Sequence, residues 1–201
     1  MPLAAAPLST DGVLAMLEAR HEASRADADA TGAWCRRLCE MIGVSPETTQ
    51  SVVTAGMLHD IGKIVVPDAI LFKAGPLTDA EWVVMKRHAQ AGAEILEHLP
   101  ALAPLAPIVR AHHERWDGRG YPAGLRRDEI PFEARIVAVA GAFHAMISPR
   151  PYRRAFEQRE AMRILRDGAG TEWDTGVVDA MLTLLDAPRT AAARRELVRG
   201  G

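Results

Sequence analysis

The segment AHHERWDGRGYP, which runs from Ala111 to Pro122, contains two adjacent histidines in front of a glycine-rich turn. A second segment, HDIGK, begins at His59 and places an aspartate and a lysine within four residues of that histidine. Neutral imidazole and carboxylate groups together form a ligand set for divalent transition metals such as iron, manganese, zinc or nickel. The residues that offer these groups are His59, Asp60, His88, His112 and His113. Their types indicate a candidate metal site.

None of these residues is specific when taken alone. A lone histidine on the apolar face of a helix is more often a hydrogen-bonded core residue than a ligand, because burial of an unpaired polar group is costly. An HD dipeptide also arises readily by chance. The indication comes from the combination of HDIGK, a histidine in the next helical segment, and a histidine pair followed by ERWDGRGYP.

This combination resembles the HD-GYP proteins, which are bacterial metal-dependent phosphodiesterases acting on cyclic di-GMP. The matching region extends from about Asp27 through Trp173. Its motifs are HDIGK, VPDAIL, GPLT followed by EWVVMKRH, HHERWDGRGYP, IPFEARIVAVA and RPYR. The resemblance implies an all-α fold, namely the helical bundle of HD domains with additional C-terminal helices of the HD-GYP type.

The resemblance also implies roles for the chemical groups. Asp60 would bridge metal ions, and imidazole ligands would come from His59, His88, His112 and His113. The metal would activate water and neutralise the phosphate during an in-line displacement, with iron or manganese expected first and zinc or nickel as alternatives. Lys63 would face the scissile phosphate and share the catalytic role with Asp60. Without the resemblance, Lys63 is an ordinary exposed lysine.

Substrate contacts are expected from two motifs. Gly118 and Gly120 would let the backbone approach a ligand closely, and Tyr121 would offer its ring and hydroxyl to a guanine or ribose. Arg150 and Arg153 of RPYR would hold phosphate through their guanidinium groups. The alternative interpretation is a surface turn with a packed tyrosine and solvated charges. Two acidic residues near the turn are interpreted as capping or supporting groups rather than ligands, Glu114 and Asp117.

Two positions depart from the family pattern. The family has a ligand aspartate where this sequence has Gly141, and glycine has no side chain to coordinate a metal. The first histidine of the family falls on Asp27 in an ungapped count back from IGVS. Asp27, together with His144 one helical turn after Gly141, is a candidate substitute ligand. We therefore expect a metal centre that lacks some of the family's ligands but keeps Asp60, His88, His112 and His113.

Two functions of different classes follow from this pattern. The first is a metal-dependent phosphodiesterase that hydrolyses cyclic di-GMP or a related phosphodiester. The second is a catalytically inactive module that binds cyclic di-GMP or a signalling partner protein, since loss of a carboxylate weakens metal binding and leaves the activated water less acidic. A third and weaker interpretation is a metal-dependent hydrolase for another nucleotide.

Helical periodicity predicts the elements that must position these residues. Ser45 and Pro46 are typical of a helix start, and this helix is expected to end near Gly62. Thr78 and Glu81 have the spacing of a capping box at the start of a second helix. Breakers divide these two helices at Pro67, Gly75 and Pro76. Further helices are expected at about 101–114, 131–147, 157–168 and 175–187.

Composition sets the remaining limits. The chain has 201 residues, of which 48% are hydrophobic, and a formal net charge of −2, so we expect one compact domain that does not bind duplex nucleic acid. The expected division is an N-terminal helical extension over 1–26, the HD-GYP domain over 27–185 and a helical tail over 186–201. Cys35 and Cys39 are interpreted as small core residues of a reduced, cytoplasmic protein. With no long apolar run, no membrane contact is expected, while apolar C-terminal helices allow an oligomer.

Overall fold

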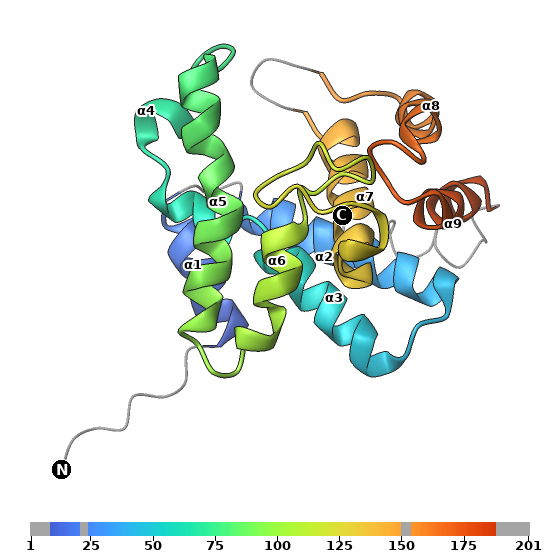
Figure 1. Ribbon diagram of the computed structural model, residues 1–201, viewed down its shortest axis with the longest axis horizontal. Helices are drawn as coiled ribbons and strands as arrows, with labels where there is room; N and C mark the ends of the chain where they lie inside the picture. The colour runs from blue at the N-terminus through green and yellow to red at the C-terminus, as the bar shows by residue number, and fades with distance from the viewer. Residues whose placement is uncertain (1–8, 21–23, 150–153, 188–201) are drawn as a thin grey trace, which may run out of the picture.

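The computed structural model describes residues 9–20, 24–149 and 154–187, which fold into helices joined by turns and loops (Figure 1). The α-helices are α1 (Thr10–Glu18), α2 (Ser24–Ile42), α3 (Pro46–Leu58), α4 (Asp68–Leu71), α5 (Asp79–Glu97), α6 (Ala106–Ala111), α7 (Phe132–Ile147), α8 (Gln158–Gly168) and α9 (Thr175–Asp186). The 3-10 helices are η1 (Ile61–Val65), η2 (Ala103–Leu105) and η3 (Arg127–Glu129). Across these described ranges, the β-type pairing consists of one isolated bridge between Ala169 and Trp173. The predicted all-α fold is confirmed.

Helix α2 lies at the centre of the bundle. It packs against α3, α7, α9 and α1, while α5 packs against α6 and η1 at one side (Figure 1). The core contains fully buried aliphatic and aromatic side chains, and Cys35 and Cys39 lie in it as buried free thiols. Their interpretation as core residues is confirmed. The packing leaves the loop between α6 and α7 next to the site residues of α3 and α5.

The predicted helix starts are confirmed in detail. The hydroxyl of Ser45 accepts a hydrogen bond from the backbone N–H of Thr48, and Pro46 is the first residue of α3. At α5, the hydroxyl of Thr78 accepts from the N–H of Glu81, and the Glu81 carboxylate accepts from the N–H of Thr78. These caps satisfy N–H groups that have no partner within the helix.

The predicted end of the first helix at Gly62 is wrong. Helix α3 ends at Leu58, and the HDIGK segment then continues as η1. The physical reason is a close approach between η1 and α5, because a Cβ atom on Gly62 would overlap the backbone carbonyl of His88. Only glycine permits this approach, and it brings the residues after His59 against α5.

The helix expected over 101–114 is also shorter than predicted. Helix α6 spans only Ala106–Ala111 and is preceded by η2. Pro104 and Pro107 lie in the first turns of these two elements, and a proline cannot donate a hydrogen bond into the preceding turn. His112 therefore lies at the C-cap, where the chain turns away. The expected connector between α3 and α5 contains η1 and the short α4, whereas α7, α8 and α9 match their predicted ranges closely.

Two expectations concern the whole chain, namely its division into parts and the absence of membrane contact. Helix α2 begins at Ser24, so the expected boundary at residue 27 falls inside a helix, and the three-part division stays a prediction. In the part of the chain that the structure describes, every helix is too short or too polar to cross a bilayer.

Candidate metal centre and its pocket

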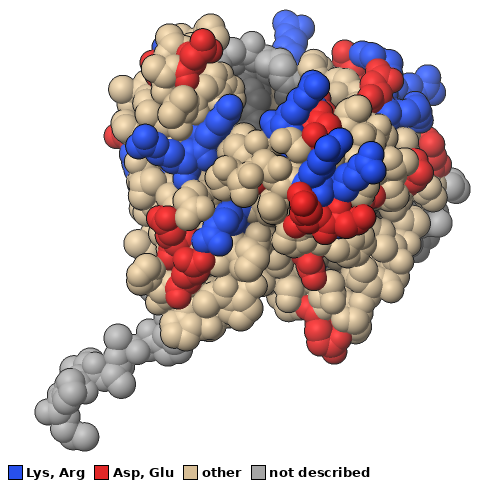
Figure 2. Space-filling view, viewed as in Figure 1, with Lys and Arg blue, Asp and Glu red and all other residues tan. Residues whose placement is uncertain are grey.

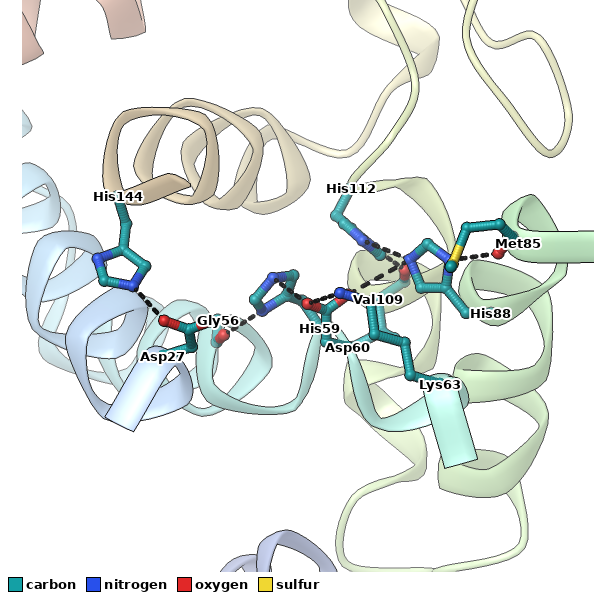
Figure 3. A network of polar contacts seen from close by, with 10 residues as sticks. All are labelled: Asp27, Gly56, His59, Asp60, Lys63, Met85, His88, Val109, His112 and His144. Atoms are coloured by element: carbon teal, nitrogen blue, oxygen red, sulfur yellow. Dashed lines mark hydrogen bonds and ion pairs between the residues drawn. The ribbon is translucent and has the colours of Figure 1, made fainter. Parts of the chain in front are cut away.

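Separate segments bring the predicted ligands together. His88 lies on α5, His112 follows α6 directly, and Asp60 lies between α3 and η1. Together with His113, each of these residues offers one ligand atom, and the four atoms lie within 4.8 Å of one another. Figure 3 shows Asp60 between His59 and the His88 and His112 rings. The structure thus assembles four of the five predicted ligands into one group.

The orientation of three histidine rings is fixed by the backbone. In each ring Nδ1 contacts the carbonyl oxygen three residues earlier, at 2.6 Å for His59, 2.8 Å for His88 and 2.5 Å for His112. A carbonyl oxygen only accepts hydrogen bonds, so Nδ1 carries the proton and Nε2 keeps its lone pair. Metal-binding histidines are commonly held in this way.

The arrangement of these lone pairs fits a bound cation. Nε2 of His88 lies 3.4 Å from Nε2 of His112, and with both protons on Nδ1 no hydrogen bond can join the two atoms. Two acceptors at this distance repel each other unless a cation lies between them. Three imidazoles and one carboxylate suit a divalent transition metal, and the set would be Asp60, His88, His112 and His113.

Asp60 is the charged centre of this group. Its carboxylate lies 2.6 Å from Nζ of Lys63, 3.3 Å from Nε2 of His59 and 3.4 Å from Nε2 of His88. Burial alone would raise the pKa of Asp60, but attraction from Lys63 and the histidines outweighs it and holds that pKa well below its usual value. The carboxylate therefore stays ionised and available to a metal at neutral pH.

Burial keeps the neighbouring imidazoles neutral. Loss of solvation is the largest cause that lowers the pKa of His88 and holds the pKa of His112 well below its usual value. For His113, burial and then repulsion from His88 lower the pKa to about 3. Neutral imidazole is the form that binds metals, so no proton has to leave these rings at pH 7.

A buried carboxylate organises the turn after the histidine pair. Glu114 is 5% exposed, and its Oε1 accepts hydrogen bonds from the N–H groups of Ala123 and Gly124 at 2.7 and 3.1 Å. Its Oε2 accepts from the N–H of Leu125 at 3.0 Å. This agrees with the interpretation of Glu114 as a capping group. The three bonds close the segment between His113 and Leu125 into a compact turn.

The turn also places Tyr121 against His113, one of the candidate metal ligands. The ring of Tyr121 stacks on that of His113, with centroids 4.8 Å apart and planes 26° apart. A Cβ atom on Gly120 would overlap the backbone of Glu114 and Arg115, so glycine is required there for the turn to fold back. The Tyr121 ring therefore supports the ring of His113. Contact of Tyr121 with a substrate stays a prediction.

Three of these four candidate ligands, Asp60, His112 and His113, line a pocket of about 520 Å³. Its walls come from α2, the α3 to η1 junction, α5, the loop after α6, α7, and the loop between α8 and α9. Predicted site residues that line it are Asp27, His59, Asp60, Lys63, His112, His113, Gly120, Tyr121, Gly141 and His144. The volume lies within the range of about 300–1,000 Å³ that is usual for small-molecule sites.

The two substitute candidates pair with each other. Nε2 of His144 lies 2.9 Å from Oδ1 of Asp27, and this contact joins α7 to α2. In Figure 3 this pair lies at the far side of His59 from Asp60 and His88. Neither residue joins the group of four, and Gly141 offers that side of the pocket no side chain. Coordination by Asp27 or His144 stays a prediction.

Some residues fall outside this comparison. Arg150 and Arg153 lie outside the described residues, so their expected contact with phosphate stays a prediction. Sequence reasoning missed several pocket residues, among them Lys86, Arg119 and Trp173. Lys86 belongs to the matching segment EWVVMKRH and Arg119 lies inside the matching turn, so a test of every cation in these motifs would have found both.

The chain matches the family model for the HD domain over residues 13–177. It is 44% identical over 162 residues to a cyclic di-GMP phosphodiesterase of Thermotoga maritima, covering 80% of this chain and 44% of that protein. It is 33% identical over 168 residues to 3'3'-cGAMP-specific phosphodiesterase 2 of Vibrio cholerae, covering 83% of this chain and 32% of that protein. The chain spans less than half of the length of these curated relatives.

Solved structures with the same fold support this relationship. The HDG"Y"P protein Bd1817 of Bdellovibrio bacteriovorus superposes with a TM-score of 0.68 at 19% identity, covering 89% of this chain and 58% of that one. The HD domain of L. monocytogenes PgpH, solved with cyclic-di-AMP, superposes with a TM-score of 0.60 at 16% identity, covering 86% of this chain and 92% of that one. The chain belongs to the HD domain family, and its resemblance to the HD-GYP proteins is confirmed.

Proposed function

We propose that this domain is a metal-dependent phosphodiesterase that hydrolyses cyclic di-GMP or a related cyclic dinucleotide. The observation that carries the proposal is the convergence of Asp60, His88, His112 and His113 within 4.8 Å at a pocket that also contains Lys63. Names of curated relatives support the substrate class, since they include cyclic di-GMP and 3'3'-cGAMP phosphodiesterases.

The residues of the pocket would divide the work. Asp60, His88, His112 and His113 would hold the metal, with iron or manganese expected before zinc or nickel, and His59 would assist from the other side of Asp60. The bound metal supplies charge neutralisation and activation of water. Lys63 places its ammonium 2.6 Å from the Asp60 carboxylate, so its charge would stabilise the phosphate as negative charge builds on it. Arg150 and Arg153 stay predicted phosphate contacts.

A second candidate function is an inactive module that binds the same ligand or a signalling partner protein. Gly141 contributes no ligand, and Asp27 is held by His144 rather than joined to the group of four. A centre with fewer ligands holds less metal and activates water less. Both positions line the pocket, which has the volume of a small-molecule site.

One experiment separates the two functions. Metal content of the purified protein is measured by mass spectrometry, and turnover of cyclic di-GMP is followed by chromatography with added iron or manganese. Bound metal with a linear or mononucleotide product supports the enzyme. Binding of cyclic di-GMP without product supports the inactive module, and absence of both product and binding contradicts the enzyme and a module that binds this ligand.

A further inference from the structure

The charged side chains that line the pocket are equal in number but unequal in their partners. The acidic ones are Asp27, Asp60, Glu114 and Glu172, and the basic ones are Lys63, Lys86, Arg115 and Arg119. A charge that is already paired or hydrogen-bonded contributes less to ligand binding than one with only water around it. The partners of each charge therefore indicate where the pocket can attract a ligand.

All four acidic groups have partners within the protein. The carboxylate of Asp60 accepts a hydrogen bond from Lys63, and the carboxylate of Asp27 contacts His144. Glu172 lies 3.1 Å from the guanidinium of Arg115. The Glu114 carboxylate accepts hydrogen bonds from three backbone N–H groups. No acidic side chain of the pocket is left to attract a cation other than the metal.

Two of the four basic groups are also paired with acidic groups of the protein. Lys63 is bonded to Asp60 at 2.6 Å. Arg115 makes a bidentate contact with Asp117 in addition to Glu172, with distances of 3.1 and 2.7 Å to the two oxygens of Asp117. These two cations therefore balance carboxylates of the protein itself.

Lys86 and Arg119 are different. Among the described residues, neither side chain forms an ion pair with an acidic group, although Asp117, which is paired with Arg115, accepts the backbone N–H of Arg119 and is also attracted by the Arg119 charge. The ammonium of Lys86 lies 5.4 Å from the centroid of the Tyr121 ring, which itself stacks on His113. Arg119 lies two residues before Tyr121 in the same turn. Lys86 therefore lies beside Tyr121, and Arg119 lines the same pocket from the turn that contains Tyr121.

We propose that Lys86 and Arg119 form an anion subsite that binds the second, non-reacting phosphate of a cyclic dinucleotide. This inference rests on the proposed function and adds to it the residues that recognise a substrate with two phosphates. The first phosphate belongs at the metal ligands and Lys63, while the ring of such a substrate carries its other phosphate away from them. In Figure 2, Lys and Arg side chains lie both over α5 and over the loop between α6 and α7.

The chemistry of the two side chains suits this task. The ammonium of Lys86 is a compact point charge on a flexible chain, and the Tyr121 ring holds it at the pocket by a cation–π contact. The guanidinium of Arg119 can donate two parallel hydrogen bonds to one phosphate. A substrate with two phosphates would thus be bound through both of them, whereas a substrate with one phosphodiester would be bound only at the metal.

The test compares two substrates in the full chain loaded with manganese. Cyclic di-GMP carries two phosphodiesters, whereas bis(p-nitrophenyl) phosphate carries one. For Lys86→Gln and Arg119→Gln we expect KM for cyclic di-GMP to rise about tenfold, with kcat within about twofold, because each loses a charge-assisted contact that forms on binding. Rates for bis(p-nitrophenyl) phosphate should not change.

Arg87→Gln is the matched control, because Arg87 is an exposed cation next to Lys86 that does not line the pocket. If Arg87→Gln and Lys86→Gln raise KM for cyclic di-GMP equally, the effect is general electrostatic attraction, and the proposed subsite is overturned. Equal losses on both substrates would overturn it as well, because they would mean damage to the metal centre.

A binding measurement separates this inference from the proposed function. If the wild type does not hydrolyse either substrate, the dissociation constant of cyclic di-GMP is measured by calorimetry. A tenfold weaker constant in Lys86→Gln and Arg119→Gln, but not in Arg87→Gln, would support the subsite in an inactive module. No binding of cyclic di-GMP by the wild type would overturn the inference together with the proposed function.

Discussion

A Cβ atom on Gly141 would lie 4.0 Å from Nε2 of His59, and outside its own helix it would meet no closer atom. The site where the family has a ligand aspartate therefore has room for a side chain that points at an imidazole.

This room leads to a prediction for Gly141→Asp. The new carboxylate would join His59 and increase the metal content by up to about one ion per chain, since carboxylate and imidazole form a ligand pair for a divalent metal. Metal content by mass spectrometry and turnover of cyclic di-GMP are the measurements. Gly141→Ala is the control, because it adds only the stability expected of a glycine replaced in a helix, about 0.5–1 kcal/mol. The same metal content in both variants would show that a missing carboxylate is not the defect.

His112→Gln tests the group of four. Loss of a supporting hydrogen bond around a metal ligand typically lowers affinity about 10- to 100-fold, so loss of the ligand itself should cost at least as much. We expect most of the metal to be lost on dialysis. His98→Gln is the matched control, since Nδ1 of His98 also donates to a backbone carbonyl oxygen, that of Glu94 four residues earlier, at 2.7 Å, but His98 lies outside the pocket. An unchanged metal load in His112→Gln would make the histidine cluster purely structural.

Glu114→Gln tests how the turn is held. The glutamine oxygen can replace one carboxylate oxygen, but its amide then faces at least one of the N–H groups of Ala123, Gly124 and Leu125, and two donors cannot bond. We expect a loss of about 1–3 kcal/mol in the free energy of unfolding and weaker metal binding through His113. Chemical denaturation and metal titration are the measurements.

The matched control for that change is Glu129→Gln. Glu129 accepts a hydrogen bond from the backbone N–H of Arg126 at the exposed η3, so its loss should cost much less. Should Glu114→Gln keep both its stability and its metal affinity, the turn would be held by other contacts.

How far the sequence predicted the fold depends on the kind of signal. Caps are local, and Ser45 and Thr78 are found where their patterns placed them. The end of α3 is set instead by contact between Gly62 and α5, a tertiary relationship that local periodicity does not contain. The apolar pattern before His112 predicts too long a helix, because Pro104 and Pro107 interrupt helical hydrogen bonding there.

The same difference between local sequence signals and tertiary contacts applies to the candidate site. Asp60, His88, His112 and His113 were predicted through motifs, and the structure brings them together. The pairing of Asp27 with His144 joins residues 117 positions apart, so no spacing rule could find it. Lys86 lies within a matching motif, but its lack of an acidic partner is a tertiary property that is known only once the neighbouring charges are seen to pair elsewhere.

The last prediction concerns pH and the metal-free protein. Unfolded histidines have a pKa near 6.5, whereas the pKa of His113 in the folded protein is about 3 and those of His88 and His112 are also lowered. Between these values the unfolded chain binds more protons than the folded protein does. The free energy of unfolding of the metal-free protein therefore falls as pH falls below about 6.5, and it levels off above that pH. Asp60 acts in the same direction at lower pH, because its folded pKa is also lowered.

Thermal melts of the metal-free protein from pH 7.5 to pH 5 would measure this dependence. We expect the melting temperature to drop across that range, and the drop to be smaller in His113→Gln, which removes one group that the unfolded chain protonates more readily. His98→Gln should keep the wild-type slope, since His98 lies outside the pocket and the histidine cluster. A wild-type slope in His113→Gln would mean that this imidazole is already solvated, and therefore protonated, in the metal-free fold.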